Sequence, residues 1–235
     1  MIISGLQKLT LLDYPGRVAC TVFLGGCNFR CPFCHNSQLL TAQVEPVMTV
    51  EELLSFLRKR KSVLDGVCIT GGEPTIHGEL PDLLRKIRSL GYCIKLDTNG
   101  YRPDVLRALV REGLVDYVAM DVKNSPDRYA ETVGLRSVDL DRVEQSLLFL
   151  MEGHVDYELR TTVAEPLHSR ESVSAMGRWL LDIGAGKKVK KLYIQPFVDR
   201  PTVPVAGLSA PDRAVLDAFL ESLAPCAEYV GLRGE

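Results

Sequence analysis

Residues 18–36 read VACTVFLGGCNFRCPFCHN, an apolar run that leads directly into three cysteines. The run at 18–24 is continuous and apolar, which is typical of a parallel strand covered on both faces. Cys27, Cys31 and Cys34 follow it with the spacing C-x3-C-x2-C. The stretch therefore predicts a buried parallel strand whose carboxyl end carries three thiols.

The rest of the chain repeats the alternation that this stretch begins. Further strands are expected at 66–70, 92–98, 117–122, 157–163 and 191–197. Helical patterns lie between and after them: from a capping box at Thr49 and Glu52, from Leu80, from Pro103, at 139–152, at 169–183, and from an N-cap at Ser209 to Leu223. Strands that alternate with helices predict an α/β fold with a parallel sheet, either open or barrel-like.

The composition is that of an ordinary globular protein and argues against several roles. Of the 235 residues 46% are hydrophobic, and 28 basic against 30 acidic side chains give a net charge of −2. This near balance gives no support to nucleic-acid or membrane-surface binding, and no apolar run approaches the ~18 residues that cross a bilayer. The first ten residues lack the pattern of a signal peptide. A cytoplasmic protein is therefore expected, with its seven cysteines as reduced thiols or metal ligands.

Polar clusters follow the predicted strands at the points where they end. The motifs after the second, third and fourth strands are TGGEP at 70–74, DTNG at 97–100 and MDVK at 120–123. Arg160 lies within the fifth strand, and the sixth ends in QPF at 195–197. In a parallel barrel, chemistry gathers at the carboxyl ends of the strands. One site built by all six units is therefore expected.

The cysteine triplet offers three thiols where common structural metal sites have four ligands. Thiolates favour soft metals, so zinc and iron–sulfur are the candidates. A zinc site would recruit His35, but His35 adjoins Cys34 directly, whereas zinc ligands are usually separated by two or more residues. A cubane cluster on three thiolates leaves one iron open to a small molecule. The spacing favours this interpretation without excluding zinc.

Each of the other motifs, taken alone, can be interpreted as structural or as part of a ligand-binding site. GGEP can be a strand-to-helix turn, or its glycines can admit a ligand close to the backbone while Glu73 accepts from an amine. Asp121 and Lys123 can form a structural ion pair or line a site. Asp97 is a second carboxylate in an apolar strand, where a charge is seldom buried without a partner.

Together these residues make the chain similar to the radical S-adenosylmethionine (SAM) superfamily, whose signature is C-x3-C-x2-C with an aromatic residue, here Phe33, before the third cysteine. Within it the chain resembles the activases of glycyl-radical enzymes. It is most similar to the longer type of anaerobic ribonucleoside-triphosphate reductase activating proteins, near pyruvate formate-lyase activating enzyme. The resemblance spans nearly the whole chain and rests on the segments LLDYPGRVACTVFLGGCNFRCPFCHN, TGGEP, DTNG, MDVK, IQPF and VGLRG.

This resemblance implies a fold and a set of site residues. The fold is expected to be a partial (β/α)6 TIM-like barrel of parallel strands in a single domain over 1–235, with its core at 17–198 and a C-terminal helical extension at 199–235. One [4Fe–4S] cluster per chain is expected on Cys27, Cys31 and Cys34. SAM is expected to chelate the open iron and to lie near Phe33, Gly71, Gly72, Glu73, Asp97, Asp121, Lys123 and Arg160. Relatives carry a histidine where this chain has Val198, and Gln195 is expected to substitute in part.

The resemblance also implies a reaction and partners. An electron from flavodoxin or ferredoxin is expected to cleave SAM into methionine and a 5′-deoxyadenosyl radical. That radical would remove one Cα hydrogen from a glycine of a partner glycyl-radical enzyme, with no side chain as acid or base. The turn at 13–16, DYPG, is expected near the opening that faces the partner. The alternatives are a pyruvate formate-lyase-type partner, a small-molecule substrate and a non-enzymatic zinc module.

Overall fold

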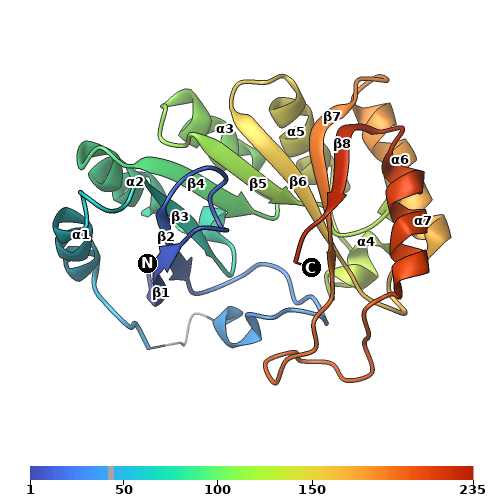
Figure 1. The fold of residues 1–235 in the computed structure, drawn as a ribbon, viewed down its shortest axis with the longest axis horizontal. Coiled ribbons are helices and arrows are strands. Elements are labelled where there is room, and N and C mark those ends of the chain that lie inside the picture. Colours follow the sequence, from blue (N-terminus) through green and yellow to red (C-terminus); the bar gives the residue numbers. More distant parts are fainter. Residues whose placement is uncertain (42–44, 235) are drawn as a thin grey trace.

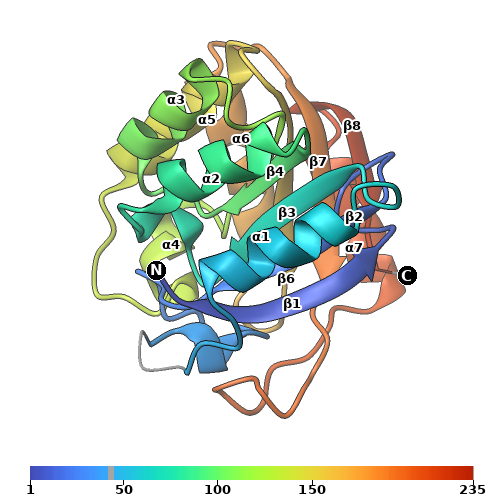
Figure 2. The same ribbon diagram turned by 90° about the vertical axis from the view of Figure 1, so that its left-hand side faces the viewer.

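The computed structural model describes residues 1–41 and 45–234. They form one eight-stranded sheet, in the order β1 to β8, that curves into an incomplete barrel with helices on its outside (Figure 1). The strands are β1 (Ile3–Thr10), β2 (Ala19–Leu24), β3 (Gly66–Gly71), β4 (Cys93–Thr98), β5 (Tyr117–Asp121), β6 (Asp156–Val163), β7 (Val189–Pro196) and β8 (Ala227–Leu232). The helices are α1 (Val50–Lys59), α2 (Leu80–Ser89), α3 (Pro103–Arg111), α4 (Pro126–Thr132), α5 (Leu140–Met151), α6 (Arg170–Ile183) and α7 (Arg213–Leu223), with short 3₁₀ turns η1 (Ser37–Leu39) and η2 (Pro74–Ile76). Figure 2 shows α1, α2 and α3 stacked along the outside of the sheet.

The six expected strands are confirmed as β2 to β7, which pair in parallel and in chain order. Two further strands were not expected: β1 pairs antiparallel with β2, and β8 pairs parallel with β7. Both lie at the edges of the sheet and are partly exposed, so they lack the continuous apolar runs that reveal buried strands. The C-terminal segment is therefore α7 followed by a strand, and not helical throughout.

The start of α1 follows the capping box that the sequence predicts. The Thr49 hydroxyl accepts from the Glu52 amide at 3.1 Å, and Glu52 Oε2 accepts from the Thr49 amide at 2.8 Å. Both bonds satisfy amides that have no partner inside the helix. The buried face of this helix then carries Leu53, Leu54 and Leu57.

The start of α7 differs from the prediction. The N-cap is Asp212, whose side chain accepts from the Val215 amide at 2.8 Å, and not Ser209. The backbone of Ser209 is occupied elsewhere, because its amide and carbonyl both bond to Glu165, at 3.2 and 2.9 Å. Ser209, which precedes Pro211, fits the sequence pattern of an N-cap, but Asp212, directly after the proline, makes the cap.

The parallel arrangement decides where a site can form. Leu24 pairs with Gly71, so the ends of β2 and β3 meet at one rim, and the other parallel strands end there too. The hairpin that contains residues 13–16 lies at the opposite end, because Thr10 pairs with Ala19 at the start of β2. This turn therefore lies away from the carboxyl rim, and its place near the partner-facing opening stays a prediction. Within the described ranges, no helix is long and apolar enough to cross a membrane.

Candidate functional site

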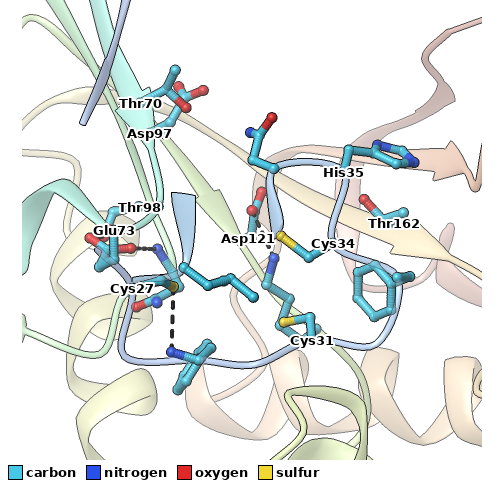
Figure 3. A pocket seen from close by; sticks show the side chains of 18 of the residues that line it. Cys27, Cys31, Cys34, His35, Thr70, Glu73, Asp97, Thr98, Asp121 and Thr162 are labelled. Atoms are coloured by element: carbon cyan, nitrogen blue, oxygen red, sulfur yellow. Dashed lines mark hydrogen bonds and ion pairs between the residues drawn. The ribbon is translucent and has the colours of Figure 1, made fainter. Parts of the chain in front are cut away.

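A cavity of about 250 Å³ lies at the carboxyl rim of the sheet (Figure 3). Every residue that the sequence analysis placed at the site lines it: Cys27, Cys31, Phe33, Cys34, Gly71, Gly72, Glu73, Asp97, Asp121, Lys123, Arg160 and Gln195. They come from the loop after β2 and from the ends of β3, β4, β5, β6 and β7. The parallel topology therefore brings together side chains that are far apart in the sequence.

The segment 25–36, here called the cysteine loop, is held to its neighbours by backbone hydrogen bonds. The Gly26 amide donates to the Leu39 carbonyl at 2.7 Å, so η1 closes the loop on one side. The Arg30 amide donates to the Val133 carbonyl at 2.8 Å, which ties the loop to the end of α4. These bonds fix the path of the loop without using the cysteine side chains.

The three loop thiols are free and project toward the cavity (Figure 3). Burial raises the pKa of Cys27 to about 12 and that of Cys31 to about 11, and it raises the pKa of Cys34 as well. The positive charge of Lys123 acts in the opposite sense on all three. No three His, Cys, Asp or Glu side chains of the described residues are placed to hold one metal ion.

The two glycines of GGEP let the end of β3 pack against the backbone at the end of β2 and at the start of the cysteine loop. A Cβ on Gly71 would lie 2.3 Å from the Leu24 carbonyl oxygen, and Gly71 has a φ of +121°. A Cβ on Gly72 would lie 2.0 Å from the Gly26 carbonyl oxygen. The sequence analysis expected close approach of a ligand here. The structure gives a different reason for glycine at both positions, because the group nearest to an added Cβ is the protein's own backbone.

Replacing Gly72 with alanine is expected to destabilise the protein by about 1–3 kcal/mol, because a well-packed backbone has to move to make room for the methyl group. Urea unfolding of the metal-free protein measures the change. Gly78→Ala is the matched control, since nothing lies within 4 Å of a Cβ at that position. Equal stability of the two variants would contradict the packing role of Gly72.

Glu73 joins the ends of β3 and β4 from inside the protein. It is 1% exposed, and its Oε1 accepts from the Thr75 amide at 3.0 Å and from the Thr98 hydroxyl at 2.7 Å. Its Oε2 accepts from the Asn99 amide at 2.6 Å. Burial raises the pKa of this carboxyl, although the surrounding donors act in the opposite sense. A carboxylate oxygen can accept two donors, so Oε2 has capacity for one more at the cavity wall.

Five charged side chains form a chain of ion pairs; four of them line the cavity, and the fifth, Lys95, is buried next to Asp97. Arg160 lies in its middle, with Nη1 3.1 Å from Asp97 and Nε 3.0 Å from Asp121. Lys123 Nζ lies 2.9 Å from Asp121, and Lys95, which the sequence analysis missed, pairs with Asp97. Burial alone would raise the pKa of both aspartates. The cations outweigh it and hold both pKa values low, at about 2 for Asp121. Glu73 adds a third carboxyl group to the cavity wall, so three cations face three carboxyl groups.

His35 is a cavity residue that the sequence analysis treated only as a zinc ligand. Its Nε2 lies 2.7 Å from the Val198 carbonyl oxygen, and its ring stacks on Phe197 with centroids 5.6 Å apart. It thus joins the cysteine loop to the segment after β7. The two partners are 163 positions apart, so no local sequence pattern could have revealed the contact.

Phe33 forms an apolar wall whose orientation is fixed by its neighbours. It is 4% exposed, although it lines the cavity. Lys123 Nζ lies 5.9 Å from the ring centre, and the His168 ring meets it edge-on at 6.3 Å. The aromatic residue before the third cysteine is therefore held as a rigid part of the site.

Comparisons with known proteins agree with this geometry. The sequence profile of the Radical SAM superfamily matches residues 21–166, more than half of the chain. A protein of Methanocaldococcus jannaschii that is named as a glycyl-radical enzyme activating enzyme is 33% identical over 189 residues, which cover 77% of this chain and 76% of that protein. The pyruvate formate-lyase-activating enzyme of Clostridium pasteurianum is 32% identical over 130 residues, 53% of each chain.

A solved structure supports the fold. SuiB of Streptococcus suis bound to S-adenosylmethionine has a TM-score of 0.67 at 15% identity, and the match covers 91% of this chain and 52% of SuiB. Similarity at this identity shows the fold alone. The chain spans about half the length of SuiB and of the Clostridium enzyme, and three quarters of the Methanocaldococcus protein.

Proposed function

This chain belongs to the radical SAM superfamily and, within it, to the glycyl-radical enzyme activating enzymes, and we propose that it activates an anaerobic ribonucleoside-triphosphate reductase. The observation that carries the proposal is the convergence of three thiols, the GGEP turn and the chain of charges on one cavity. Radical SAM oxidoreductases use a [4Fe–4S] cluster and SAM. The choice of the reductase rests on the segments over nearly the whole chain that resemble its activating proteins. We also propose that residues 1–235 act as one domain.

The residues of the cavity fit both cofactors. Cys27, Cys31 and Cys34 would hold the cluster, because soft thiolate ligands suit iron–sulfur centres and three of them leave one iron for another ligand. The amino group of SAM would donate to the free acceptor position on Glu73 Oε2. Its carboxylate would face the cationic side chains of Arg160 and Lys123. The remaining contacts would come from Phe33, Gly71, Gly72, Asp97, Asp121, Lys123 and Gln195.

The side chains of this cavity would position and shield the reacting groups. When bound, the cluster and SAM supply a 5′-deoxyadenosyl radical that takes one hydrogen atom from a glycine Cα. Asp97 and Asp121 are unsuited to act as bases, because their low pKa values and their cation partners keep them ionised and occupied. Their role would be to hold Arg160 and to balance charge at the cavity wall.

The partner would have to bring a glycine loop into the barrel. Glycine suits this chemistry because it has no side chain in the way and its Cα radical is stabilised by two amides. Within the described part of the chain β1 and β8 do not pair, so the barrel stays open between its edges. This gap is the entry that the proposal requires. Flavodoxin or ferredoxin would supply the electron.

Electron paramagnetic resonance (EPR) on mixtures with candidate partners tests the proposal. The reduced, iron-loaded protein is incubated with SAM and, separately, with an anaerobic ribonucleoside-triphosphate reductase, with a pyruvate formate-lyase, or with no partner. A glycyl doublet is expected with the reductase. A doublet only with the lyase would overturn the choice of partner. SAM cleavage without a doublet in any mixture would overturn the activase proposal in favour of a small-molecule substrate.

A further inference from the structure

A second hollow, of about 280 Å³, lies beside β1, and the proposed function gives it no role. It is lined by residues 4–7 of β1, by Phe23 of β2, and by Asn36, Gln38 and Leu39 of the segment around η1. None of these residues carries a charge, and three of them have carboxamide side chains. The hollow therefore suits an uncharged ligand that forms hydrogen bonds.

The edge of β1 that faces away from β2 can accept another strand. In the sheet order β1 is the first strand, so β2 is its neighbour on one side only (Figure 2). Ile3 pairs with Leu24 of β2 and also forms a bridge with Met48 on the other side. In this bridge the Val47 amide donates to the Ile3 carbonyl at 2.9 Å. Beyond Ile3, no backbone pairing among the described residues covers that edge, so it offers backbone donors and acceptors to another chain.

The hollow adjoins the cavity at the carboxyl rim. Asn36 lines both of them, and it lies between the third cysteine and the start of η1. A segment that occupies the hollow can therefore extend past Asn36 toward the place where the cavity would hold SAM. The hollow also lies on the β1 side of the gap between β1 and β8, which the proposed function requires as its entry.

A glycine substrate favours recognition through the backbone. Glycine has no side chain, so a side-chain pocket cannot hold the reacting residue itself. A strand edge instead binds an extended segment by main-chain hydrogen bonds, while hollows beside it take alternate side chains. Such pairing fixes the rotation of the segment about its own axis. It would therefore also fix which of the two Cα hydrogens of the glycine faces the cavity.

We propose that the glycine segment of the partner enzyme binds as an added strand on the free edge of β1, with its glycine toward Asn36. This inference rests on the proposed function and states how the partner is held. The carboxamides of Asn36 and Gln38 each supply a donor and an acceptor for backbone groups of the segment that β1 does not reach. The residues on either side of the glycine are expected to be uncharged, because the lining of the hollow is uncharged.

Peptides that copy the segment around the radical glycine of an anaerobic ribonucleoside-triphosphate reductase test the pairing. Each peptide carries one N-methyl group, which removes one backbone donor, and its binding to the iron-loaded protein with SAM is measured by fluorescence anisotropy without oxygen. Loss of one backbone hydrogen bond is expected to weaken binding about fivefold, and only at every second residue, because alternate residues face the neighbouring strand. Equal affinity of all the peptides, or losses that do not alternate, would overturn the inference.

Gln7→Trp and Lys8→Trp are a matched pair of variants on β1. Both side chains are exposed, so the fold should tolerate either change. Gln7 lines the hollow and Lys8 does not, because successive residues of a strand face opposite sides. The larger side chain in Gln7→Trp is expected to fill the hollow and to raise the reductase concentration for half-maximal radical formation about tenfold or more. Lys8→Trp is expected to stay within about twofold of the wild type.

The same variants separate failure of this inference from failure of the proposed function. An equal half-maximal concentration for Gln7→Trp and Lys8→Trp would overturn the inference and leave the proposed function intact. A wild-type dimer that Gln7→Trp converts to a monomer in analytical ultracentrifugation would show that a second copy of the chain covers the edge, and it would also overturn the inference. Absence of a glycyl doublet from the wild-type protein with the reductase would instead overturn the proposed choice of partner.

Discussion

Replacing Cys31 with alanine is expected to reduce SAM cleavage more than about 100-fold while the fold is retained. Removing a residue that only hydrogen-bonds to a metal ligand typically lowers metal affinity or activity about 10–100-fold. Removing a ligand itself should therefore lower activity further. The fold should survive because backbone bonds hold the cysteine loop and none of them uses the Cys31 side chain. The measurements are 5′-deoxyadenosine production by chromatography and far-ultraviolet circular dichroism of the same samples.

Cys93→Ala is the control for this experiment. Cys93 is a free cysteine at the start of β4, and the residues that line the cavity do not include it. Its substitution is expected to leave SAM cleavage within about twofold of the wild type, since a half-buried thiol there acts as a small apolar side chain. SAM cleavage by Cys31→Ala at the rate of this control would show that the cluster is held elsewhere.

Replacing Arg160 with methionine is expected to destabilise the protein by about 3 kcal/mol. Arg160 is shared between Asp97 and Asp121, and removing one partner of a buried ion pair leaves uncompensated charge. The expected loss of stability is at the lower end of the range for broken buried ion pairs, because Asp97 still pairs with Lys95 and Asp121 still pairs with Lys123. Arg102→Met is the control, because its pair with Asp104 is exposed and contributes less than about 1 kcal/mol.

The Arg160→Met variant and the wild-type protein should also differ in their response to acid. The pKa of Asp121 lies at about 2 in the folded protein against 3.8 for an ordinary aspartate, so its ionised form stabilises the fold above about pH 4. That contribution is lost as the pH falls toward 2. Without Arg160 the pKa of Asp121 rises, and the variant should lose stability at higher pH than the wild type. Parallel acid-unfolding curves would contradict the assigned charge balance.

The convergence of the site could be predicted from the sequence because it follows from local patterns and one topological rule. Continuous apolar runs locate β2 to β7, and parallel strands must end at the same rim. Every motif placed after those strands therefore had to meet the cysteine loop. Lys95 could also have been found, since it is two residues from Asp97 in an apolar strand and so shares its face.

Other features depend on contacts that leave no local trace. Gly72 looked like a ligand contact, and only the position of the Gly26 carbonyl shows that backbone packing demands it. The edge strand β8 is marked by its pairing with β7 and not by an apolar run.

The fate of the glycine hydrogen tests the central claim most directly. A partner reductase is produced with glycine deuterated at Cα and is incubated with the reduced protein and SAM, and the 5′-deoxyadenosine formed is analysed by mass spectrometry. The account predicts 5′-deoxyadenosine that carries one deuterium, together with a glycyl radical in the reductase. Unlabelled 5′-deoxyadenosine, formed beside a reductase that keeps its deuterium, would contradict it.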